Sequence, residues 1–367
     1  MDPIGQSQIV PYLNKLADMH EIYVLSLEKK NINKIIINPK IVWIKKNFYK
    51  TKIKFFKIID ILKLLIYARN ILKHNLIESI HCRGHIPAFV AYVLIFFYKK
   101  KIIFDFRGFW IEERFDNQLW SKRNIVHIFA FYLFKLLEKK ILLKSSKVVV
   151  LTSTAKSFLI KKFGIPKKNL FVIPCCADFN FFKKIFKKKK KKYLNICYVG
   201  SYGNIYMFKE MYEFYVNLKK NLNINFHLFV NNLSEFKKDK IYNKFKYDNN
   251  VFITKSSRKQ LIKYLSIMDY SVCFIRPTFA RITASFPTKL AEVLACGIPV
   301  LYNNCMSDVN YYMRKNKLNQ MVNLNKFKKL NLRNINILDK KIIQNQYSNY
   351  LDIKRGVNSY NLVYEKK

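Results

Sequence analysis

The clearest signal of the fold is the stretch Ser285-Phe286-Pro287-Thr288-Lys289-Leu290-Ala291-Glu292-Val293-Leu294-Ala295-Cys296-Gly297-Ile298-Pro299-Val300. Pro287 and Thr288 are residue types that begin helices, and Gly297 is a type that ends them. The pattern therefore predicts a short helix over residues 288–296 that leads into a strand over residues 298–302.

Glu292 lies in the middle of this small apolar helix, where a carboxylate needs a partner or a ligand. It shares a helix face with Lys289, so a weak surface ion pair is one interpretation. The other is a nucleotide site, because a carboxylate can accept hydrogen bonds from both hydroxyls of a ribose. The helix N-terminus beside Lys289 would then hold a diphosphate. The residues alone leave both interpretations open.

Outward from this segment, short β-branched and aromatic runs alternate with longer helical patterns. Strands are expected over residues 22–27, 102–106, 147–152, 170–173, 195–199, 225–230, 270–275 and 298–302. Such alternation is typical of βα units with parallel sheets, which predicts an α/β fold.

The length of 367 residues suggests roughly two domains. Six consecutive lysines, Lys187–Lys192, repel one another and stay solvated, so they favour an interdomain linker over a nucleic-acid-binding tail. We expect a first domain over residues 1–182, a linker over 183–193 and a second domain over 194–345.

The charge balance is strongly basic, with 68 Lys and Arg against 23 Asp and Glu, a net charge of +45. Only 11 of the basic residues are Arg, and this excess of lysine is typical of an A/T-rich genome. An anionic partner is the other explanation: nucleic acid, a membrane surface or a phosphorylated substrate. Because the lysines are dispersed rather than grouped with aromatic residues on one element, we expect no nucleic-acid partner.

Other classes are excluded by composition. Half of the residues are hydrophobic, which argues against disorder. Seven cysteines without paired spacing argue against a disulfide framework or a metal site and fit a reducing cytoplasm. The N-terminus lacks the pattern of a signal peptide. The longest apolar run, Ala88–Tyr98, is shorter than the roughly 18–20 residues of a membrane span.

One helix is marked by polar residues that recur every three or four positions between Lys50 and Lys73. This stripe is either the wet edge of a helix that packs on the core or the cationic side of a helix on an anionic membrane. The stripe consists of Lys50, Lys54, Lys57, Asp60, Lys63, Tyr67, Asn70 and Lys73.

A second group of candidate residues lies in the first domain. Arg83 and His85 follow a short expected strand, and they either point toward an interdomain cleft or are structural. Mixed charges beside an aromatic ring suit recognition of a sugar or a diphospholipid, and an internal salt-bridge network is the alternative. Such residues gather at the end of the strand over 102–106: Asp105, Arg107, Trp110, Glu113 and Arg114.

Taken together, these motifs resemble the family 4 glycosyltransferases, retaining enzymes of GT-B fold. The stretch 285–300 is similar to their donor-site signature, in which a glutamate at the position of Glu292 grips the nucleotide ribose. Further stretches resemble a bacterial surface-polysaccharide branch of the family: Gly5–Gln8, Asp105–Trp110, Tyr198–Ser201, Phe274–Pro277 and Gly356–Tyr364. The resemblance implies two Rossmann-like domains facing across a cleft, with a C-terminal helix over residues 346–367 that crosses back to the first domain.

The resemblance also implies a division of labour. Arg276 and Lys289 would be the catalytic cations at the departing diphosphate, and Arg276 follows a strand end, where α/β folds bind ligands. The donor-binding residues would be Glu292, Thr288, Gly200, Ser201 and Pro287. The acceptor or cleft residues would be Gly5, Arg83, His85, Asp105, Arg107, Trp110, Glu113 and Arg114.

The implied reaction transfers a sugar from a nucleotide-diphosphate donor to a glycan or polyprenyl-linked acceptor, for capsule, O-antigen or similar surface glycans. No metal or separate cofactor is expected. We expect a cytoplasmic protein, with peripheral binding to the anionic inner face of the plasma membrane as a further hypothesis. A non-catalytic scaffold of the same fold and, less favoured, a basic nucleic-acid-binding protein are the alternatives.

The chain departs from the family at two places. Many members carry a second glutamate eight residues before the first, at a position that touches the transferred sugar, and here it is Ala284. Relatives also begin with an apolar strand before the Asp-Pro-x-Gly loop, whereas Met1 directly precedes Asp2. Since a sheet without its inner strand leaves backbone groups unpaired, we expect about 10–15 further residues upstream.

Overall fold

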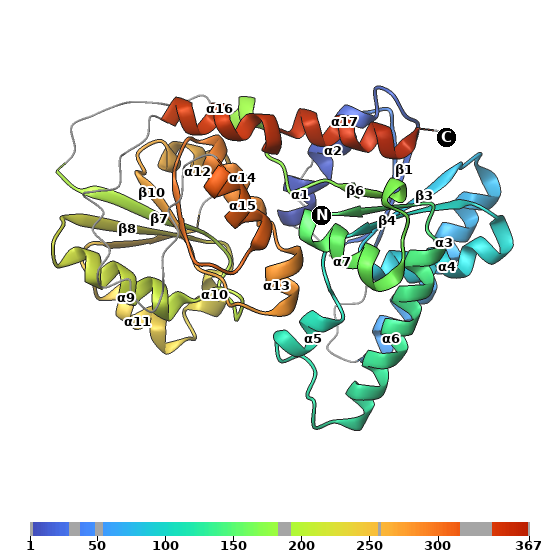
Figure 1. The fold of residues 1–367 in the computed structure, drawn as a ribbon, viewed down its shortest axis with the longest axis horizontal. Helices are drawn as coiled ribbons and strands as arrows, with labels where there is room; N and C mark the ends of the chain where they lie inside the picture. The colour runs from blue at the N-terminus through green and yellow to red at the C-terminus, as the bar shows by residue number, and fades with distance from the viewer. Residues whose placement is uncertain are drawn as a thin grey trace. The chain divides into compact units, whose positions relative to one another are not determined.

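The computed structural model describes residues 3–28, 37–47, 54–182, 192–255, 258–315 and 340–365. It divides into two compact α/β units, each built on parallel strands (Figure 1). The first unit comprises Met1–Pro174 together with Ile353–Lys367, and the second comprises Cys175–Asp352.

The first unit contains a two-stranded and a four-stranded parallel sheet. The small sheet pairs β1 (Ile22–Glu28) with β2 (Ile41–Asn47). The larger sheet has the order β3 (Ser79–Arg83), β4 (Lys101–Phe106), β5 (Lys147–Val150) and β6 (Leu170–Val172). All residues of β4 after Lys101 are buried, as expected for a central strand that is covered on both faces.

Eight α-helices belong to the described part of this unit, and local capping defines several of their ends. The Asn124 side chain accepts hydrogen bonds from two N–H groups of the first turn that follows it, and Thr152 caps the next helix in the same way. The helices are α1 (Pro3–Gln8), α2 (Val10–Leu16), α3 (Lys54–His74), α4 (His85–Tyr98), α5 (Glu112–Asp116), α6 (Ile125–Lys144), α7 (Ser153–Phe163) and α17 (Ile353–Tyr364).

The C-terminal segment returns to the first unit, as the sequence predicts. It forms two helices rather than one: α16 (Lys340–Leu351) belongs to the second unit, and α17 packs on α2 of the first (Figure 1). The chain therefore passes from one unit to the other at Asp352, inside the range 346–367 that the sequence assigns to a single crossover helix.

The second unit is a five-stranded parallel sheet with the order β11-β10-β7-β8-β9. Its strands are β7 (Leu194–Gly200), β8 (Ile224–Val230), β9 (Val251–Thr254), β10 (Tyr270–Cys273) and β11 (Val300–Tyr302). The chain builds outward from β7 in one direction and then returns to add β10 on its other side. This reversal makes the sheet doubly wound, with its topological switch point between β7 and β10.

Helices cover this sheet, and aromatic side chains fill its core. Tyr198, Phe214, Tyr215 and Phe226 are all fully buried in one hydrophobic cluster. Besides α16, the helices are α8 (Phe179–Phe182), α9 (Phe208–Lys219), α10 (Leu233–Phe236), α11 (Lys240–Lys246), α12 (Arg258–Leu265), α13 (Phe279–Ala284), α14 (Thr288–Ala295) and α15 (Ser307–Lys315).

Each strand range expected from the sequence contains a strand, but the expectation omitted β2 and β9, and it gave no range for β3, which extends to Arg83. The observed division between the units falls before Cys175 rather than after residue 182, because the segment that follows joins the second unit. There the Ala177 N–H donates to the Leu351 carbonyl, and α8 packs on α14. Most of the expected linker 183–193 lies outside the described residues.

The polar stripe expected on α3 is only partly a wet edge: Asn70 and Lys73 are exposed, but its other described members are not. Asp60 is buried, whereas Ile58 and Ile66 on the same helix are each 56% exposed. The helix thus turns apolar side chains outward and part of its polar stripe inward. Lys50 lies outside the described residues.

Candidate functional site

The loops that follow β7 and β10 are joined at the carboxyl edge of the second sheet. The Arg276 N–H donates to the Ile205 carbonyl at 2.8 Å, and the Met207 N–H donates to the Phe274 carbonyl at 3.0 Å. Because β7 and β10 are neighbouring parallel strands at the switch point, Gly200, Ser201 and Arg276 lie on the edge where α/β folds bind ligands.

Gly200 has a local reason to be glycine. A Cβ at this position would lie 2.4 Å from the Tyr198 hydroxyl oxygen. That hydroxyl donates to the carbonyl of Ser201 at 2.7 Å and so braces the turn that leaves β7. The glycine therefore permits a close approach of a tyrosine to the backbone, while Ser201 itself is exposed.

Helix α14 brings the predicted donor-binding residues to the same edge. It connects β10 to the parallel strand β11, so it runs against the strand direction and its N-terminus lies at the carboxyl ends. Pro287 occupies the N-cap without a side-chain cap, and Thr288 begins the helix. A helix start of this kind favours an anion through its N–H groups and dipole.

The predicted pair of Lys289 and Glu292 forms, but it is not a surface pair. Lys289 Nζ donates to Glu292 Oε2 at 2.8 Å, and Glu292 is only 1% exposed. Lys289 remains partly exposed. Removing Lys289 would leave an uncompensated charge on a buried carboxylate, which costs more free energy than breaking an ion pair between solvated side chains.

Two further positions complete the description of this edge. Arg276 is exposed, and its backbone is held to the loop that follows β7. Ala284, at the position where many family members have a glutamate, is buried at the end of α13.

In the first unit, the structure brings Arg83, Asp105 and Arg107 together in an internal network. The Asp105 carboxylate is fully buried and accepts hydrogen bonds from Arg83 at 3.2 Å, from Arg107 at 3.5 Å and from the Tyr360 hydroxyl at 3.2 Å. His81 lies 3.6 Å away. Burial by itself would raise the pKa of Asp105, but Arg107, His81 and Arg83 outweigh it and hold the pKa well below its usual range.

The sequence did not point to a second buried network beneath the neighbouring loop. Glu138 on α6 is fully buried, accepts from His85 at 2.8 Å and pairs with Lys135. Lys135 also reaches Glu112 on α5, at 2.8 Å. Burial would raise the pKa of Glu138, but the hydrogen bond from His85 and the charge of Lys135 lower it. The available signal was a single acidic residue in a helix rich in apolar residues, as it was for Glu292.

Trp110, Glu113 and Arg114 form a cluster above this network. The Trp110 ring stacks on His85 with centroids 5.5 Å apart, and the Arg114 guanidinium lies 4.0 Å from the centre of the Trp110 ring. Burial lowers the pKa of Arg114, and the charge of Glu113 opposes this. Gly5 is buried in α1, where its carbonyl accepts from the Ile9 N–H.

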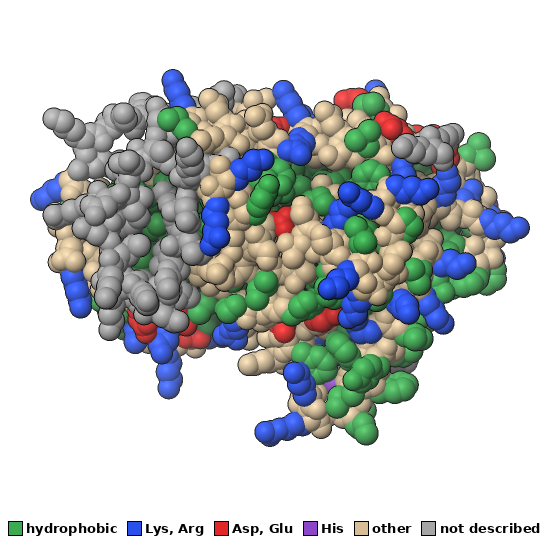
Figure 2. All heavy atoms as spheres, in the orientation of Figure 1, with side chains coloured by type: hydrophobic (Ala, Val, Ile, Leu, Met, Phe, Trp, Pro, Cys, Tyr) green, Lys and Arg blue, Asp and Glu red, His purple; other side chains and the backbone are tan. Residues whose placement is uncertain are grey.

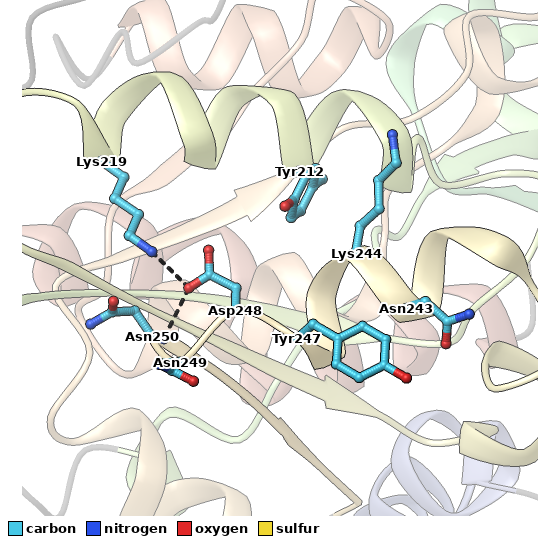
Figure 3. A pocket seen from close by; sticks show the side chains of 8 residues that line it. All are labelled: Tyr212, Lys219, Asn243, Lys244, Tyr247, Asp248, Asn249 and Asn250. Carbon is cyan, nitrogen blue, oxygen red and sulfur yellow. Dashed lines mark hydrogen bonds and ion pairs between the residues drawn. The ribbon is translucent and has the colours of Figure 1, made fainter.

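A shallow hollow of about 600 Å³ lies elsewhere on the second unit (Figure 3). Lys219 precedes β8 and Asn250 precedes β9, so the hollow is at the amino edge of the sheet, away from the predicted site residues. Asp248 in its wall accepts from Lys219 at 2.7 Å and from the Asn250 N–H at 2.9 Å. These hydrogen bonds stabilise the turn before β9. They give Lys219, Asp248 and Asn250 a structural role, so no ligand is needed to account for them.

The described residues contain neither a metal-binding cluster nor a membrane-spanning helix. No group of three or more His, Cys, Asp and Glu side chains among them is arranged to hold a metal ion. None of the helices in the described part is both long and apolar enough to cross a membrane.

Comparison with known structures supports the fold. A sucrose-phosphate synthase from Thermosynechococcus elongatus has a TM-score of 0.74 at 12% identity, with 96% of this chain and 91% of that chain covered. WaaG, a glycosyltransferase involved in lipopolysaccharide biosynthesis, has a TM-score of 0.65 at 11% identity, with 97% and 95% covered. HepE from Anabaena, solved with UDP and glucose, has a TM-score of 0.60 at 9% identity, with 94% and 98% covered.

Comparison with family models accounts for nearly the whole chain. A search of curated proteins gave no significant match. Residues 12–181 match the model of Glycosyltransferase Family 4, and residues 178–350 match the model of Glycosyl transferases group 1. The two matches meet close to the division between the two α/β units. The chain is therefore a glycosyltransferase with the GT-B fold, and it belongs to family 4.

Proposed function

We propose that this enzyme transfers a sugar, with retention, from a nucleotide-diphosphate donor held at the carboxyl edge of the second sheet. The observation that carries the proposal is Glu292, a buried carboxylate on a helix whose N-terminus lies at the switch-point edge. HepE, which shares the fold, was solved with UDP and glucose, which supports a nucleotide-sugar donor here.

In this proposal the acidic donor-site residue binds the ribose, and the cationic residue binds the diphosphate. The Glu292 carboxylate accepts hydrogen bonds from the ribose hydroxyls, and Lys289 holds that carboxylate in its orientation. Arg276 and the start of α14 at Pro287 and Thr288 face the diphosphate, while Gly200 and Ser201 shape the loop beside it. No metal is required, because these cations and backbone amides oppose the charge of the leaving group.

The chemical step forms a bond between the acceptor hydroxyl oxygen and the anomeric carbon, on the face from which the diphosphate departs. The bond from that carbon to the diphosphate oxygen breaks, and the hydroxyl proton passes to the departing diphosphate. The protein supplies positioning and charge stabilisation rather than a nucleophile.

The acceptor side is assigned to the first unit. Trp110 and Arg114 place an aromatic ring and a cation side by side at the start of α5, next to the buried network of His85, Glu138 and Lys135. Such a pair suits a sugar ring next to a phosphate, as in a glycan or polyprenyl-linked acceptor. We place the reaction in the synthesis of a cell-surface polysaccharide, at the cytoplasmic face of the membrane.

The test is Glu292→Gln, which keeps the size of the side chain and removes its charge. We expect the affinity for the donor nucleotide, measured by calorimetry with UDP and GDP, to fall more than tenfold. Glu138→Gln is the matched control, because it neutralises an equally buried carboxylate in the other unit. Unchanged nucleotide affinity in Glu292→Gln would refute the ribose assignment.

A further inference from the structure

Three neighbouring helices of the first unit, α3, α4 and α6, expose many apolar side chains. Helix α4 packs between the other two. On α6, Ile125 is 80% exposed and Phe129 is 69% exposed, and hydrophobic atoms gather over this helix in Figure 2. The apolar residues of this outer face are Ile58, Ile61, Leu62 and Ile66 on α3, Ile86, Val93, Phe96 and Phe97 on α4, and Ile125, Val126, Phe129, Tyr132, Leu133 and Leu136 on α6.

The same three helices carry cations and no exposed acid. Asp60 and Glu138 are the only acidic residues of the three helices, and both are buried. The exposed charged residues of the helices themselves are positive: Arg69, Lys73, Lys139, Lys140 and Lys144. Lys99, Lys122 and Arg123 add exposed cations next to α4 and α6, while Glu78, in the loop after α3, is an exposed acid. We call this set of apolar and cationic side chains the outer face.

The sign of the charge selects among possible occupants. Large exposed apolar patches mark surfaces that bind something. A second copy of the chain would bring two cationic faces together in a protein of net charge +45, which Coulomb repulsion disfavours. An anionic bilayer instead offers acyl chains for the apolar side chains and headgroups for the lysines.

We propose that the outer face docks the enzyme on an anionic lipid bilayer, with α6 as its principal contact. The exposed side of α6 is apolar over residues 125–136 and cationic at Lys139, Lys140 and Lys144. The apolar turns enter the boundary of the acyl chains, and the lysines bind phosphate headgroups. This replaces the sequence hypothesis of a polar stripe on α3 as the membrane contact. The inference deepens the proposed function, since it places the first unit where a lipid-linked acceptor lies, but the binding itself requires no substrate.

The test is flotation of the full chain with vesicles of phosphatidylcholine, with and without phosphatidylglycerol, in the absence of nucleotide. We expect binding to the anionic vesicles at low salt, weaker binding at high salt and little binding to phosphatidylcholine alone. Leu136→Glu should weaken binding at least about tenfold. The matched control is Leu362→Glu on α17, because both leucines are 53% exposed; it should change binding less than about twofold.

A second pair of variants tests the electrostatic part. Replacing both Lys139 and Lys140 by Gln should weaken binding roughly 20-fold, at about fivefold for each lysine near a charged surface. The control replaces Lys237 and Lys238, which are exposed on the second unit, by Gln. Both double variants then have the same net charge, and only the variant on α6 should lose binding.

Three results would overturn the proposal. One is the absence of binding to anionic vesicles at low salt. Another is an equal loss of vesicle binding in a variant of the outer face and in its matched control. The third is a dimer in solution that Leu136→Glu dissociates while vesicle binding persists. UDP binding, measured on the same proteins, separates the two proposals, because loss of vesicle binding with intact UDP binding rejects the outer face alone.

Discussion

Two buried carboxylates, Asp105 in the first unit and Glu292 in the second, are held in different ways. Asp105, which lies in β4, accepts from Arg83 of β3, from Arg107 in the loop after β4 and from Tyr360 of α17, so it joins three elements. The ion pair of Glu292 is made within one turn of α14. A carboxylate that joins several elements serves the fold, whereas an ion pair within one helical turn can give way to a ligand with little movement of the helix. We therefore propose a structural role for Asp105 and a ligand-binding role for Glu292.

The largest expected effect is on the structural side of this comparison. Asp105→Asn leaves Arg83 and Arg107 without a counter-charge and should lower the free energy of unfolding by about 3 kcal/mol. Glu292→Gln should cost less, about 1 kcal/mol, because Lys289 is partly exposed and can turn to solvent. Urea unfolding monitored by fluorescence measures both. Equal losses would break the distinction between the two carboxylates.

On the binding side, Arg276→Gln should lower turnover about 100-fold, the usual effect of removing one group that stabilises transition-state charge. Its free energy of unfolding should change by less than about 0.5 kcal/mol, because the side chain is exposed. Arg314→Gln, another exposed arginine of the second unit, is the control. If both variants retain full turnover with a nucleotide sugar, Arg276 has no catalytic role.

A smaller effect is expected from pH. The pKa values of Asp105 and Glu138 are lowered in the folded state, so their contribution to stability is present above about pH 4–5 and is lost as the pH falls below. Urea midpoints between pH 3 and pH 6 should therefore decline on acidification, and Asp105→Asn should show a shallower decline. An identical dependence of the urea midpoint on pH in Asp105→Asn would show that protonation of Asp105 does not contribute to the loss of stability in acid.

The extent of the α14 segment was predictable because its signals are local. Helix α14 covers Thr288–Ala295 against an expected 288–296, since proline and glycine define its ends. The burial of the Lys289–Glu292 pair was not predictable, because it results from packing by distant parts of the chain. Strand β2, which ends in Lys45-Lys46-Asn47, is too polar for periodicity to identify. Strand β9 was missed although it is as long as β10, which was expected.

The first unit shows the same limit more strongly. Asp105, Arg83 and Arg107 were recognised as a group, but Tyr360 is 255 residues away along the chain and only the fold brings it to the same carboxylate. The orientation of α3 is another case. Its polar stripe predicts an exposed edge, yet Asp60 is buried, and apolar side chains such as Ile58 and Ile66 are exposed beside Asn70 and Lys73.

The most direct test of the central claim compares two ligands on two proteins. UDP and 2′,3′-dideoxy-UDP, which lacks both ribose hydroxyls, are titrated into the natural chain and into Glu292→Gln by calorimetry. If Glu292 accepts hydrogen bonds from the ribose, the natural chain should bind UDP at least about tenfold more tightly than the dideoxy ligand, and the variant should bind the two about equally. The same preference for UDP in both proteins would contradict the assignment of Glu292.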